Sequence, residues 1–418
     1  MARGASATAK PATEWSESKN VCWKVALPGS GTSTPVIWND RVFILTAIKE
    51  HSPGAKAPRP ETTTTEPSPV GPGGRPRGGM NVEKPAEEYQ FAVLCLNRTN
   101  GEILWQRTAV ETVPHEAHHR DHGFASASPV TDGEHIYAYF GSRGLYCYDL
   151  KGNLKWSKDF GDMQTRNSFG EGSSPALFGD TIIINWDDEQ ENDFIIALNK
   201  RTGEQLWKTP RNEGTSWSTP VVASHTKPPQ VVVNGRTTRG YDLKTGAELW
   251  NCSGQTANPI PSVANEGDLL IAMSGFRGSA IRAIKLGSTG TLDETEGVLW
   301  SHSKSTPYVP SPLLVDGLLY FVSGNNGMLS CFDAATGKAH YEAERLPGIF
   351  GIYASPVAAD GRVYVLGREG VCLVLKQGPT LEVLSSNKLD EKADASIALA
   401  GKDLFIRGHQ SLYCIAEK

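Results

Sequence analysis

A unit of about 45 residues recurs along this chain of 418 residues, and the recurrence constrains the fold more than any single residue does. One complete copy begins at Ser311. It reads as four short strands joined by turns at Asp316-Gly317, Gly324 to Gly327 and Thr336-Gly337. A period of 40 to 50 residues with four strands is typical of a β-propeller blade, because one four-stranded sheet cannot bury both faces until it packs against neighbours.

Two series of residues count the copies. A small residue followed by proline opens each copy, at Pro35, Pro129, Pro175, Pro220, Pro312 and Pro356, with degraded copies at Pro261-Ser262 and Ala395-Ser396. An aromatic or apolar residue marks the last strand, at Trp23, Trp105, Trp156, Trp207, Trp250, Trp300, Tyr341 and Leu384. Both series count to eight.

The phase of the repeat predicts how the ring closes. The first closing strand, Val21 to Leu27, precedes any opening strand, whereas the last copy stops after Leu412 to Ile415. The N-terminal strand should therefore complete the C-terminal blade. The predicted fold is all-β, an eight-bladed β-propeller of four-stranded antiparallel blades.

The chain divides into one large domain and two accessory segments. Residues 1–20 are predicted to be an N-terminal arm with Trp15 as its anchor, and residues 21–418 a single propeller. Within the first blade, residues 48–88 form an insertion rich in Pro, Gly and Thr, a composition that cannot bury enough apolar area to fold alone. We expect a mobile loop, which is either a tolerated insertion or a flap or partner-binding segment.

Charge and hydropathy exclude several classes of protein. The net charge of −5 offers no basic stripe for nucleic acid. No apolar run reaches the roughly 18 residues that span a bilayer, and Met1 to Lys10 lacks the apolar core of a secretory signal. A cytoplasmic protein is expected if the chain is full length, and a periplasmic or secreted one if it is a trimmed mature chain. A monomer is expected in either case.

The cysteines favour core packing. Four of the seven, Cys95, Cys147, Cys331 and Cys414, fall at equivalent points of the third strands. Cys22 and Cys414 are predicted to lie on adjacent strands of the closing blade, which leaves a disulfide between them open.

The antiparallel order of the strands gathers the chemically interesting loops on one side. Connections between successive antiparallel strands alternate between the two faces of the ring. The loops between second and third strands and the loops between blades must therefore share one face, which we call the loop face.

Four of the ten histidines lie in one blade-to-blade loop, at His115, His118, His119 and His122. Neutral imidazoles bind transition metals, and Glu116 and Asp121 could ligate the metal or orient the histidines. The alternative is a polar loop whose histidines hydrogen-bond to neighbouring blades.

An acidic run in the third blade includes Asp187, Asp188 and Glu189. Carboxylates are the ligands that calcium prefers, although the spacing matches no EF-hand. The run is either a calcium site or a solvated loop.

Basic, aromatic and polar residues are predicted at further loop tips. The candidate ligand-binding residues are Arg143, Arg166, Asn167, Trp217, Arg239, Asn258, Arg277, Tyr308, Tyr353, Arg368, Asp394 and His409, with Arg236 beside Arg239. Arginine recognises carboxylate, sulfate or phosphate, and aromatic rings stack on sugars. A central funnel so lined would hold a small anionic or carbohydrate ligand. The alternative is that the arginines solvate the rim and pair with the acidic loop.

The repeat resembles that of the PQQ-like β-propeller family. The resemblance is carried by Asp242 to Trp250, in the pattern Asp-x-x-Thr-Gly-x-x-x-Trp, and less completely by Asn199 to Trp207 and Asn97 to Trp105. It implies a propeller with a BamB-like architecture, in a family whose members are typically exported from the bacterial cytoplasm. Quinone-dependent dehydrogenases of the family carry two adjacent cysteines, and no two cysteines are adjacent here.

Three functions follow as hypotheses. The first is an extracytoplasmic scaffold that binds a ligand or a protein partner on the loop face, with no cofactor. The second is a lyase or hydrolase that acts on an anionic sugar with a divalent metal, calcium or a transition metal. The third, a PQQ-dependent oxidoreductase, is the least favoured.

Overall fold

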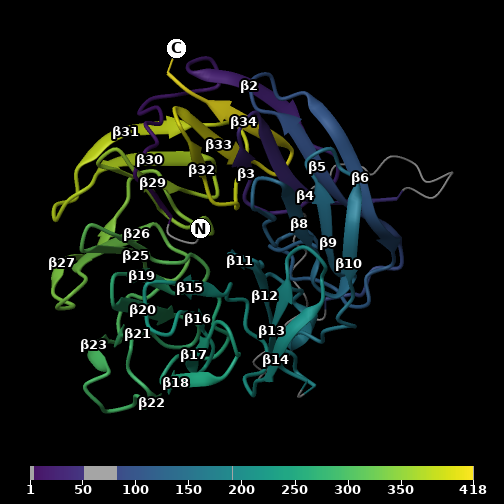
Figure 1. The fold of residues 1–418 in the computed structure, drawn as a ribbon. Helices are drawn as coiled ribbons and strands as arrows, with labels where there is room; N and C mark the ends of the chain where they lie inside the picture. The colour runs from purple at the N-terminus through teal and green to yellow at the C-terminus, as the bar shows by residue number, and fades with distance from the viewer. Residues whose placement is uncertain (1–3, 51–81, 191, 418) are drawn as a thin grey trace, which may run out of the picture.

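The chain folds into a closed ring of eight antiparallel β-sheets in a computed structural model that describes residues 4–50, 82–190 and 192–417 (Figure 1). The predicted fold class is confirmed. Within those residues the only helical elements are two short 3₁₀ turns, Gly141–Arg143 and Arg166–Ser168. None of the described helices is long and apolar enough to cross a membrane.

The first four blades follow one another along the chain. Blade 1 comprises β3 (Val36–Trp38), β4 (Arg41–Lys49), β5 (Tyr89–Asn97) and β6 (Ile103–Thr112). Blade 2 comprises β7 (Val130–Thr131), β8 (His135–Tyr139), β9 (Leu145–Asp149) and β10 (Leu154–Lys158). Blade 3 comprises β11 (Ala176–Phe178), β12 (Thr181–Trp186), β13 (Phe194–Asn199) and β14 (Gln205–Pro210). Blade 4 comprises β15 (Val221–Ala223), β16 (Gln230–Val233), β17 (Thr238–Asp242), β18 (Glu248–Cys252) and β22 (Gly290–Thr291).

The last four blades complete the ring. Blade 5 comprises β19 (Ala264–Glu266), β20 (Leu269–Ser274), β21 (Ala280–Lys285) and β23 (Val298–His302). Blade 6 comprises β24 (Leu313–Val315), β25 (Leu318–Val322), β26 (Met328–Asp333) and β27 (Ala339–Arg345). Blade 7 comprises β1 (Ala5–Ser6), β28 (Val357–Ala359), β29 (Arg362–Leu366), β30 (Val371–Lys376) and β31 (Val383–Lys388). Blade 8 comprises β2 (Val21–Ala26), β32 (Ala398–Ala400), β33 (Asp403–Arg407) and β34 (Ser411–Ile415).

Burial explains why the strands of a blade differ in sequence. The middle strands β4 and β5 are almost continuously buried, because neighbouring blades cover both of their faces. The outer strand β14 alternates, with Trp207 buried and its neighbours Leu206 and Lys208 exposed. Clusters of buried apolar residues accordingly lie between adjacent blades, as between blades 5 and 6.

The Thr-Gly and Trp positions of the repeat form the contact between consecutive blades. The indole of Trp207 in blade 3 donates a hydrogen bond of 3.0 Å to the Leu243 carbonyl in blade 4. Its ring lies under Gly246, where φ is +74° and a Cβ would come within 2.4 Å of the indole. Only glycine suits this turn. Equivalent pairs join Trp23 to Gly101, Trp105 to Gly152, Trp156 to Gly203 and Trp300 to Gly337.

The ring closes as the phase of the repeat predicts. Strand β2 pairs antiparallel with β34, with Trp23 opposite Cys414, and so becomes the outer strand of blade 8 (Figure 1). Cys22 sits at a break in the pairing register and is exposed. All seven cysteines are free thiols in this structure.

Two blades carry a fifth strand that the repeat does not predict. Strand β22, from the connection within blade 5, pairs parallel with β18 at the outer edge of blade 4. Strand β1, from the N-terminal arm, pairs parallel with β28 at the inner edge of blade 7.

The rest of the arm packs against blades 7 and 8. Trp15 is 3% exposed within a cluster that includes Tyr364 and Ile406. Its backbone N–H donates a hydrogen bond to Asn387 Oδ1 at 2.8 Å. Of the insertion predicted at 48–88, residues 51–81 lie outside the described residues. On either side of the insertion, strand β4 ends at Lys49 and strand β5 begins at Tyr89.

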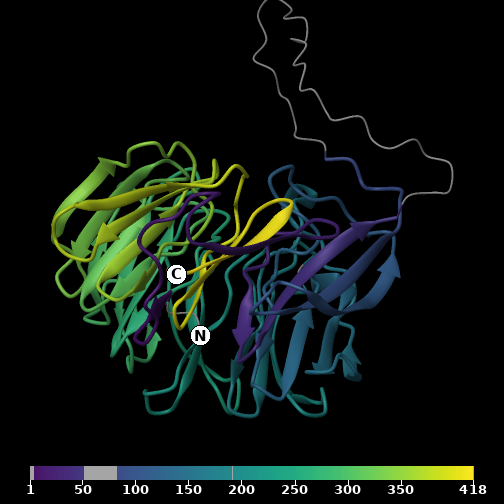
Figure 2. The same cartoon turned by 90° about the horizontal axis from the view of Figure 1, so that it is seen from above.

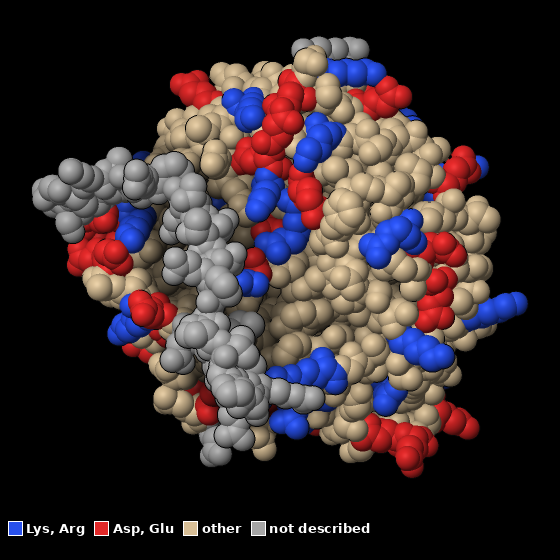
Figure 3. Space-filling model, turned by 180° about the vertical axis from the view of Figure 1, so that it is seen from behind, with Lys and Arg blue, Asp and Glu red and all other residues tan. Residues whose placement is uncertain are grey.

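The strands run between the two faces of the ring, which is seen edge-on in Figure 2. The loop face is the one seen in Figure 3, where basic and acidic side chains lie interspersed around a central hollow. No patch of a single sign dominates that view, which agrees with the small net charge.

Candidate functional site

The histidine-rich loop between blades 1 and 2 reaches across the loop face to blade 7. Arg368 Nη2 lies 3.1 Å from Asp121 Oδ1, and the Tyr353 hydroxyl donates to Asp121 Oδ2 at 3.2 Å. The Arg368 guanidinium also lies over the Tyr353 ring, 3.9 Å from its centroid. The structure thus brings together two of the predicted ligand-binding residues, and it joins them to a loop from a distant blade.

Asp394 extends this cluster toward blade 8. Its carboxylate accepts hydrogen bonds from Arg368 Nε at 2.7 Å and from His409 Nε2 at 2.9 Å. Burial raises the pKa of Asp394, but the hydrogen bonds from His409 and Arg368 outweigh it and the net shift is downward. Arg368 is therefore neutralised by two carboxylates, and the cluster offers no free cation to a ligand.

The four histidines do not gather around one point. His115 and Arg143 meet at a small cavity beside blade 2, where Arg143 Nη2 lies 3.1 Å from His115 Nδ1. His118 packs edge-on against Phe124, and His119 against Phe169.

His122 is engaged at both ring nitrogens. Nε2 donates to the Glu171 carbonyl at 3.0 Å, and Nδ1 lies 2.9 Å from the Ser126 hydroxyl. Burial lowers the pKa of His122 to about 4. Among the described residues, the potential metal-binding groups whose atoms lie within 4.8 Å of one another include His115 but none of the other three histidines. A metal site at His118, His119 and His122 stays a prediction.

The acidic run of blade 3 is largely occupied by the protein itself. Asp187 forms a fully buried pair with Arg211, with Nε 2.7 Å from Oδ1, and Asp187 also accepts from Asn185 Nδ2 at 2.9 Å. Asp188 caps the N–H of Gln190, and Glu189 Oε1 accepts from Thr215 N at 2.9 Å. A calcium site at Asp187, Asp188 and Glu189 stays a prediction, and calcium would have to compete with these donors.

A larger groove lies on the loop face above blades 3 and 4. It has a volume of about 460 Å³, and the residues that line it are Arg166, Glu189, Asn212, Glu213, Gly214, Thr215, Arg236, Thr237, Ser253, Gly254, Gln255 and Asn258. Three blade-to-blade loops and the second-to-third loops of blades 3 and 4 supply these residues. Volumes of 300 to 1,000 Å³ are typical of small-molecule sites.

Two exposed guanidinium groups lie in this groove. Arg166 Nη1 donates to Oδ1 of the buried Asn258 at 3.2 Å, so two predicted ligand-binding residues are in direct contact. Within residues 4–50, 82–190 and 192–417, Arg236 forms no ion pair with a carboxylate within 4.0 Å, and neither does Arg166. Neither charge is therefore paired with a carboxylate of the described residues.

The carboxylates that line the groove are engaged by other groups. Glu213 is buried, pairs with Arg239 Nε at 2.9 Å and accepts from the N–H of Thr237 at 3.1 Å. Glu189 accepts from the N–H of Thr215. Glu213 is therefore paired with a cation, whereas Glu189 keeps its charge because its partner is a neutral N–H, and the lining also carries the positive charges of Arg166 and Arg236.

One amide donor of the groove lacks a partner. The Oε1 atom of Gln255 accepts from the Ser274 hydroxyl at 2.7 Å, which fixes the side chain. Its Nε2 atom is buried and has no hydrogen-bond partner among the described residues. A buried donor without a partner is rare in native proteins and indicates a place for a ligand or water.

The remaining predicted residues lie outside the groove lining. Arg277, with φ of +53°, is exposed beside Phe276, whose ring stacks on Tyr308 at 5.1 Å. The Trp217 indole donates to the Gly170 carbonyl at 2.6 Å. Asn167 is exposed in the 3₁₀ turn next to Arg166.

Sequence reasoning missed several residues of these sites. Glu213 and Gln255 carry no motif, and Glu171 and Tyr139 approach His115 and Glu116 only through the packing of blade 2 against the next loop. The polar and charged residues of the loops were the signal available. They identified Arg166, Glu189, Arg236 and Asn258 of the groove and His115, Glu116 and Arg143 of the small cavity.

The fold, the repeat contacts and the loop-face sites define an eight-bladed propeller built from tryptophan-docked repeats. The chain belongs to the PQQ-like β-propeller family. The family model that matches it, over residues 90–340, is described as outer membrane protein assembly factor BamB.

Similar proteins extend the comparison. Tetrathionate hydrolase of Acidithiobacillus ferrooxidans is 25% identical over 297 residues, which cover 65% of this chain and 53% of the relative. This chain therefore matches about half the length of that relative.

Two solved structures share the fold. BamB from Moraxella catarrhalis has a TM-score of 0.56 at 14% identity, covering 80% of this chain and 95% of that chain. The quinohemoprotein alcohol dehydrogenase of Comamonas testosteroni has a TM-score of 0.62 at 10% identity, covering 97% of this chain and 78% of that chain.

The residues present do not reproduce the pattern of the quinone-dependent dehydrogenases. No two of the seven cysteines are adjacent in the sequence, so the adjacent pair of those enzymes is missing here.

Proposed function

We propose that this chain is an extracytoplasmic ligand-binding propeller that holds a small anionic ligand in the groove above blades 3 and 4. The observation that carries the proposal is that Arg166 and Arg236 both line one groove of about 460 Å³. Both guanidinium groups are exposed and free of carboxylate partners among the described residues, while the carboxylates nearby are already satisfied.

The chemistry of the lining favours an oxyanion. Guanidinium groups donate paired hydrogen bonds to carboxylate, sulfate, sulfonate or phosphate oxygens. The free Gln255 amide adds a neutral donor from the side of blade 5. Glu213 is paired with Arg239, which also pairs with Glu248, so the repulsion that Glu213 exerts on a negative ligand is reduced.

The class of ligand to test first comes from a relative. Tetrathionate, the substrate named for the hydrolase of A. ferrooxidans, is a doubly charged sulfur oxyanion, and the groove is lined by two arginines. Carbohydrates and protein partners remain the other candidate occupants of the loop face. The description of the family as an outer membrane assembly factor supports a periplasmic or secreted location.

A thermal-shift series tests the proposal. Tetrathionate, thiosulfate, sulfate, phosphate and glucuronate are compared with neutral glucose at constant ionic strength. The expected result is a saturable rise in Tm with at least one anion and none with glucose, because a ligand at 100 times its Kd adds about 2.7 kcal/mol of stability. The absence of a saturable rise with every anion would contradict the proposal.

A hydrolase that acts on an anionic substrate is the second candidate. The tetrathionate hydrolase relative favours it, and so does the Ser126 hydroxyl, which lies 2.9 Å from His122 Nδ1. Because His122 Nε2 donates to the Glu171 carbonyl, Nδ1 is an acceptor, and it competes with the Gly123 carbonyl, also 2.9 Å away, for the serine proton. Transfer of that proton to Nδ1 is the step that would activate a nucleophile.

Substrate turnover tests this candidate. Loss of tetrathionate, and cleavage of uronate-containing oligosaccharides, are followed over time with wild type and Ser126→Ala. Turnover that is lost in Ser126→Ala would support a hydrolase. Absence of turnover of both substrates by wild type would remove the candidate.

A further inference from the structure

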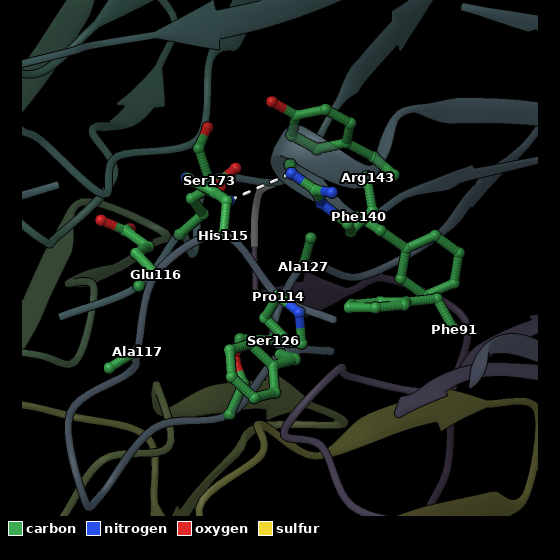
Figure 4. A pocket seen from close by; sticks show the side chains of 16 residues that line it. Phe91, Pro114, His115, Glu116, Ala117, Ser126, Ala127, Phe140, Arg143 and Ser173 are labelled. Atoms are coloured by element: carbon green, nitrogen blue, oxygen red, sulfur yellow. Dashed lines mark hydrogen bonds between the residues drawn. The ribbon is translucent and has the colours of Figure 1, made fainter. Parts of the chain in front are cut away.

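A second, much smaller cavity lies between blade 2 and two blade-to-blade loops. Its volume is about 30 Å³, room for one or two water molecules or a single ion. In the view of Figure 4, Arg143 and Glu116 lie on opposite sides of His115, and the hydrogen bond between Arg143 and His115 is drawn. The cavity is separate from the anion groove, since the two share no lining residue.

Three potential metal ligands converge on this cavity. A ring nitrogen of His115 and one carboxylate oxygen each from Glu116 and Glu171 lie within 4.8 Å of one another. Ligand atoms about 2.1 Å from one zinc ion are about 3.4 Å apart in tetrahedral geometry. If the three side chains moved slightly closer together, their ligand atoms could therefore coordinate one ion and leave a position for a water molecule or the Tyr139 hydroxyl.

The hydrogen bonds of His115 prepare it for this role. Nε2 donates to the Met163 carbonyl at 2.6 Å, which places the proton on Nε2 and leaves the lone pair on Nδ1. A backbone carbonyl that holds the far ring nitrogen is the usual support of a metal-binding histidine. Arg143, which now donates to Nδ1, also pairs with Asp162 and can keep that partner if a metal takes its place.

The two carboxylates are held in place by donors from neighbouring loops. Glu116 accepts from Thr165 N at 3.1 Å and Thr165 Oγ1 at 2.6 Å. Glu171 accepts from Ser142 N at 2.6 Å and Ser142 Oγ at 2.5 Å. Each carboxylate oxygen has two lone pairs, so a second acceptor site stays free on each.

Burial and neighbouring charges shift the pKa values of both Glu116 and Glu171. Burial, together with the charge of Glu116, raises the pKa of Glu171 to about 8, although the hydrogen bonds from Ser142 and the charge of Arg143 act in the opposite direction. Burial also raises the pKa of Glu116. A divalent ion would bind the deprotonated form of both carboxyl groups, in competition with the proton and with the positive charge of Arg143, which also lines the cavity.

A second observation comes from Tyr139, which lines the same cavity. Tyr139 is 2% exposed, and its hydroxyl has no hydrogen-bond partner among the described residues. It lies close enough to Glu171 for that carboxylate to raise the pKa of the phenol. A buried hydroxyl without a partner is costly, so the site is incomplete as the protein alone builds it.

We propose that this cavity binds one divalent cation, with His115, Glu116 and Glu171 as ligands and the Tyr139 hydroxyl facing the ion or a water bound to it. One imidazole and two carboxylates suit zinc or manganese better than magnesium, which prefers oxygen alone. The ion would tie the histidine-rich loop to the loop that enters blade 3.

Calorimetric titration of chelator-treated protein with Zn²⁺, and separately with Mn²⁺, tests the site. The expected result is one ion per chain, with at least a tenfold loss of affinity in Glu171→Gln. The matched control is Glu111→Gln, in the exposed group Glu50, Glu88 and Glu111, which should leave the affinity unchanged. Failure of both ions to bind, or equal affinity in Glu171→Gln, overturns the proposal.

Tyr139→Phe provides a second test, which remains informative if Glu171→Gln does not fold. Without metal, the variant should have a Tm equal to or above that of wild type, because it removes a buried hydroxyl that lacks a partner. With saturating metal the order should reverse, and the affinity should fall severalfold. An unchanged affinity, or a lower Tm without metal, would overturn the role of Tyr139 and with it the proposed site.

Discussion

Asp121 and Arg368 are 247 positions apart in the sequence, and their side chains form an ion pair of 3.1 Å on the loop face. This pair anchors the loop between blades 1 and 2 to blade 7. The loop therefore spans the blades between them, and its position does not depend on its own blade alone.

Replacing Arg368 by Ala should release this loop. The variant loses the hydrogen bonds to Asp121 and Asp394, so its free energy of unfolding should fall by about 2 kcal/mol. Amide hydrogen exchange over residues 118–124 should become faster. Denaturant titration and hydrogen exchange measure the two effects. Arg201→Ala, at an exposed pair 3.8 Å long, is the control and should cost below about 0.5 kcal/mol. Unchanged exchange in the loop would contradict the anchoring role.

Because Asp187 and Arg211 form a buried ion pair, removing one partner should destabilise the protein much more than replacing both. Asp187→Ala leaves the Arg211 charge buried beside Tyr241, so it should cost about 3 to 5 kcal/mol. Asp187→Leu combined with Arg211→Met should recover much of that loss, since no charge is then left unpaired. Equal destabilisation of the single and double variants, measured by denaturant midpoints, would contradict this.

Asp132, in the turn between β7 and β8, should make stability depend on acid pH. Burial raises the pKa of Asp132, but hydrogen bonds from the N–H groups of Glu134 and His135 and the Lys200 ammonium lower it to about 2. A carboxyl whose folded pKa lies below its unfolded pKa stabilises the protein above the unfolded value, near pH 4, and loses that contribution as pH falls to about 2. The contribution at neutral pH is about 2 kcal/mol.

The measurement is the urea midpoint of wild type and Asp132→Asn between pH 2 and pH 7. Wild type should be more stable by nearly the full amount above pH 4, and the two should converge toward pH 2. A difference between the two proteins that stays constant over this range would show that the carboxylate charge is not responsible.

Trp15 should fasten the N-terminal arm to the ring. Because its indole is 3% exposed between blades 7 and 8, Trp15→Ala should cost about 3 kcal/mol or more. Trp38→Ala, at a tryptophan that is 39% exposed on blade 1, is the matched control and should cost about 1 kcal/mol. Equal losses for the two variants in thermal or denaturant unfolding would show that the arm is not held by this contact.

The repeat predicts the ring because its residues perform one structural task in most blades. A tryptophan on an outer strand and a glycine with positive φ in the next blade are local signals, and each fixes a contact between blades. The β22 strand is unpredicted because it lies in the third connection of blade 5, residues 286–297, which is longer than the corresponding turns of the other blades and contains a segment that no repeat position marks.

The sites are less predictable than the ring, because they depend on which loops meet. Arg166 and Arg236 stand out in the sequence, yet their common groove depends on the order of three blades. Asp394 and His409 form an ion-paired cluster with Arg368 in place of a ligand pocket. The partners Glu171 and Tyr139 carry no sequence signal, since their proximity to His115 arises only from packing.

The central claim is that Arg166 and Arg236 bind an anion in the groove above blades 3 and 4. Its most direct test is calorimetric titration, with the anion that gives the largest thermal shift, of wild type, of Arg166→Ala combined with Arg236→Ala, and of Arg277→Ala. Arg277 is an exposed loop-tip arginine outside the groove lining, so its removal controls for general charge. We predict loss of binding by more than tenfold in the double variant and unchanged affinity in Arg277→Ala. Equal affinity in all three proteins would contradict the claim.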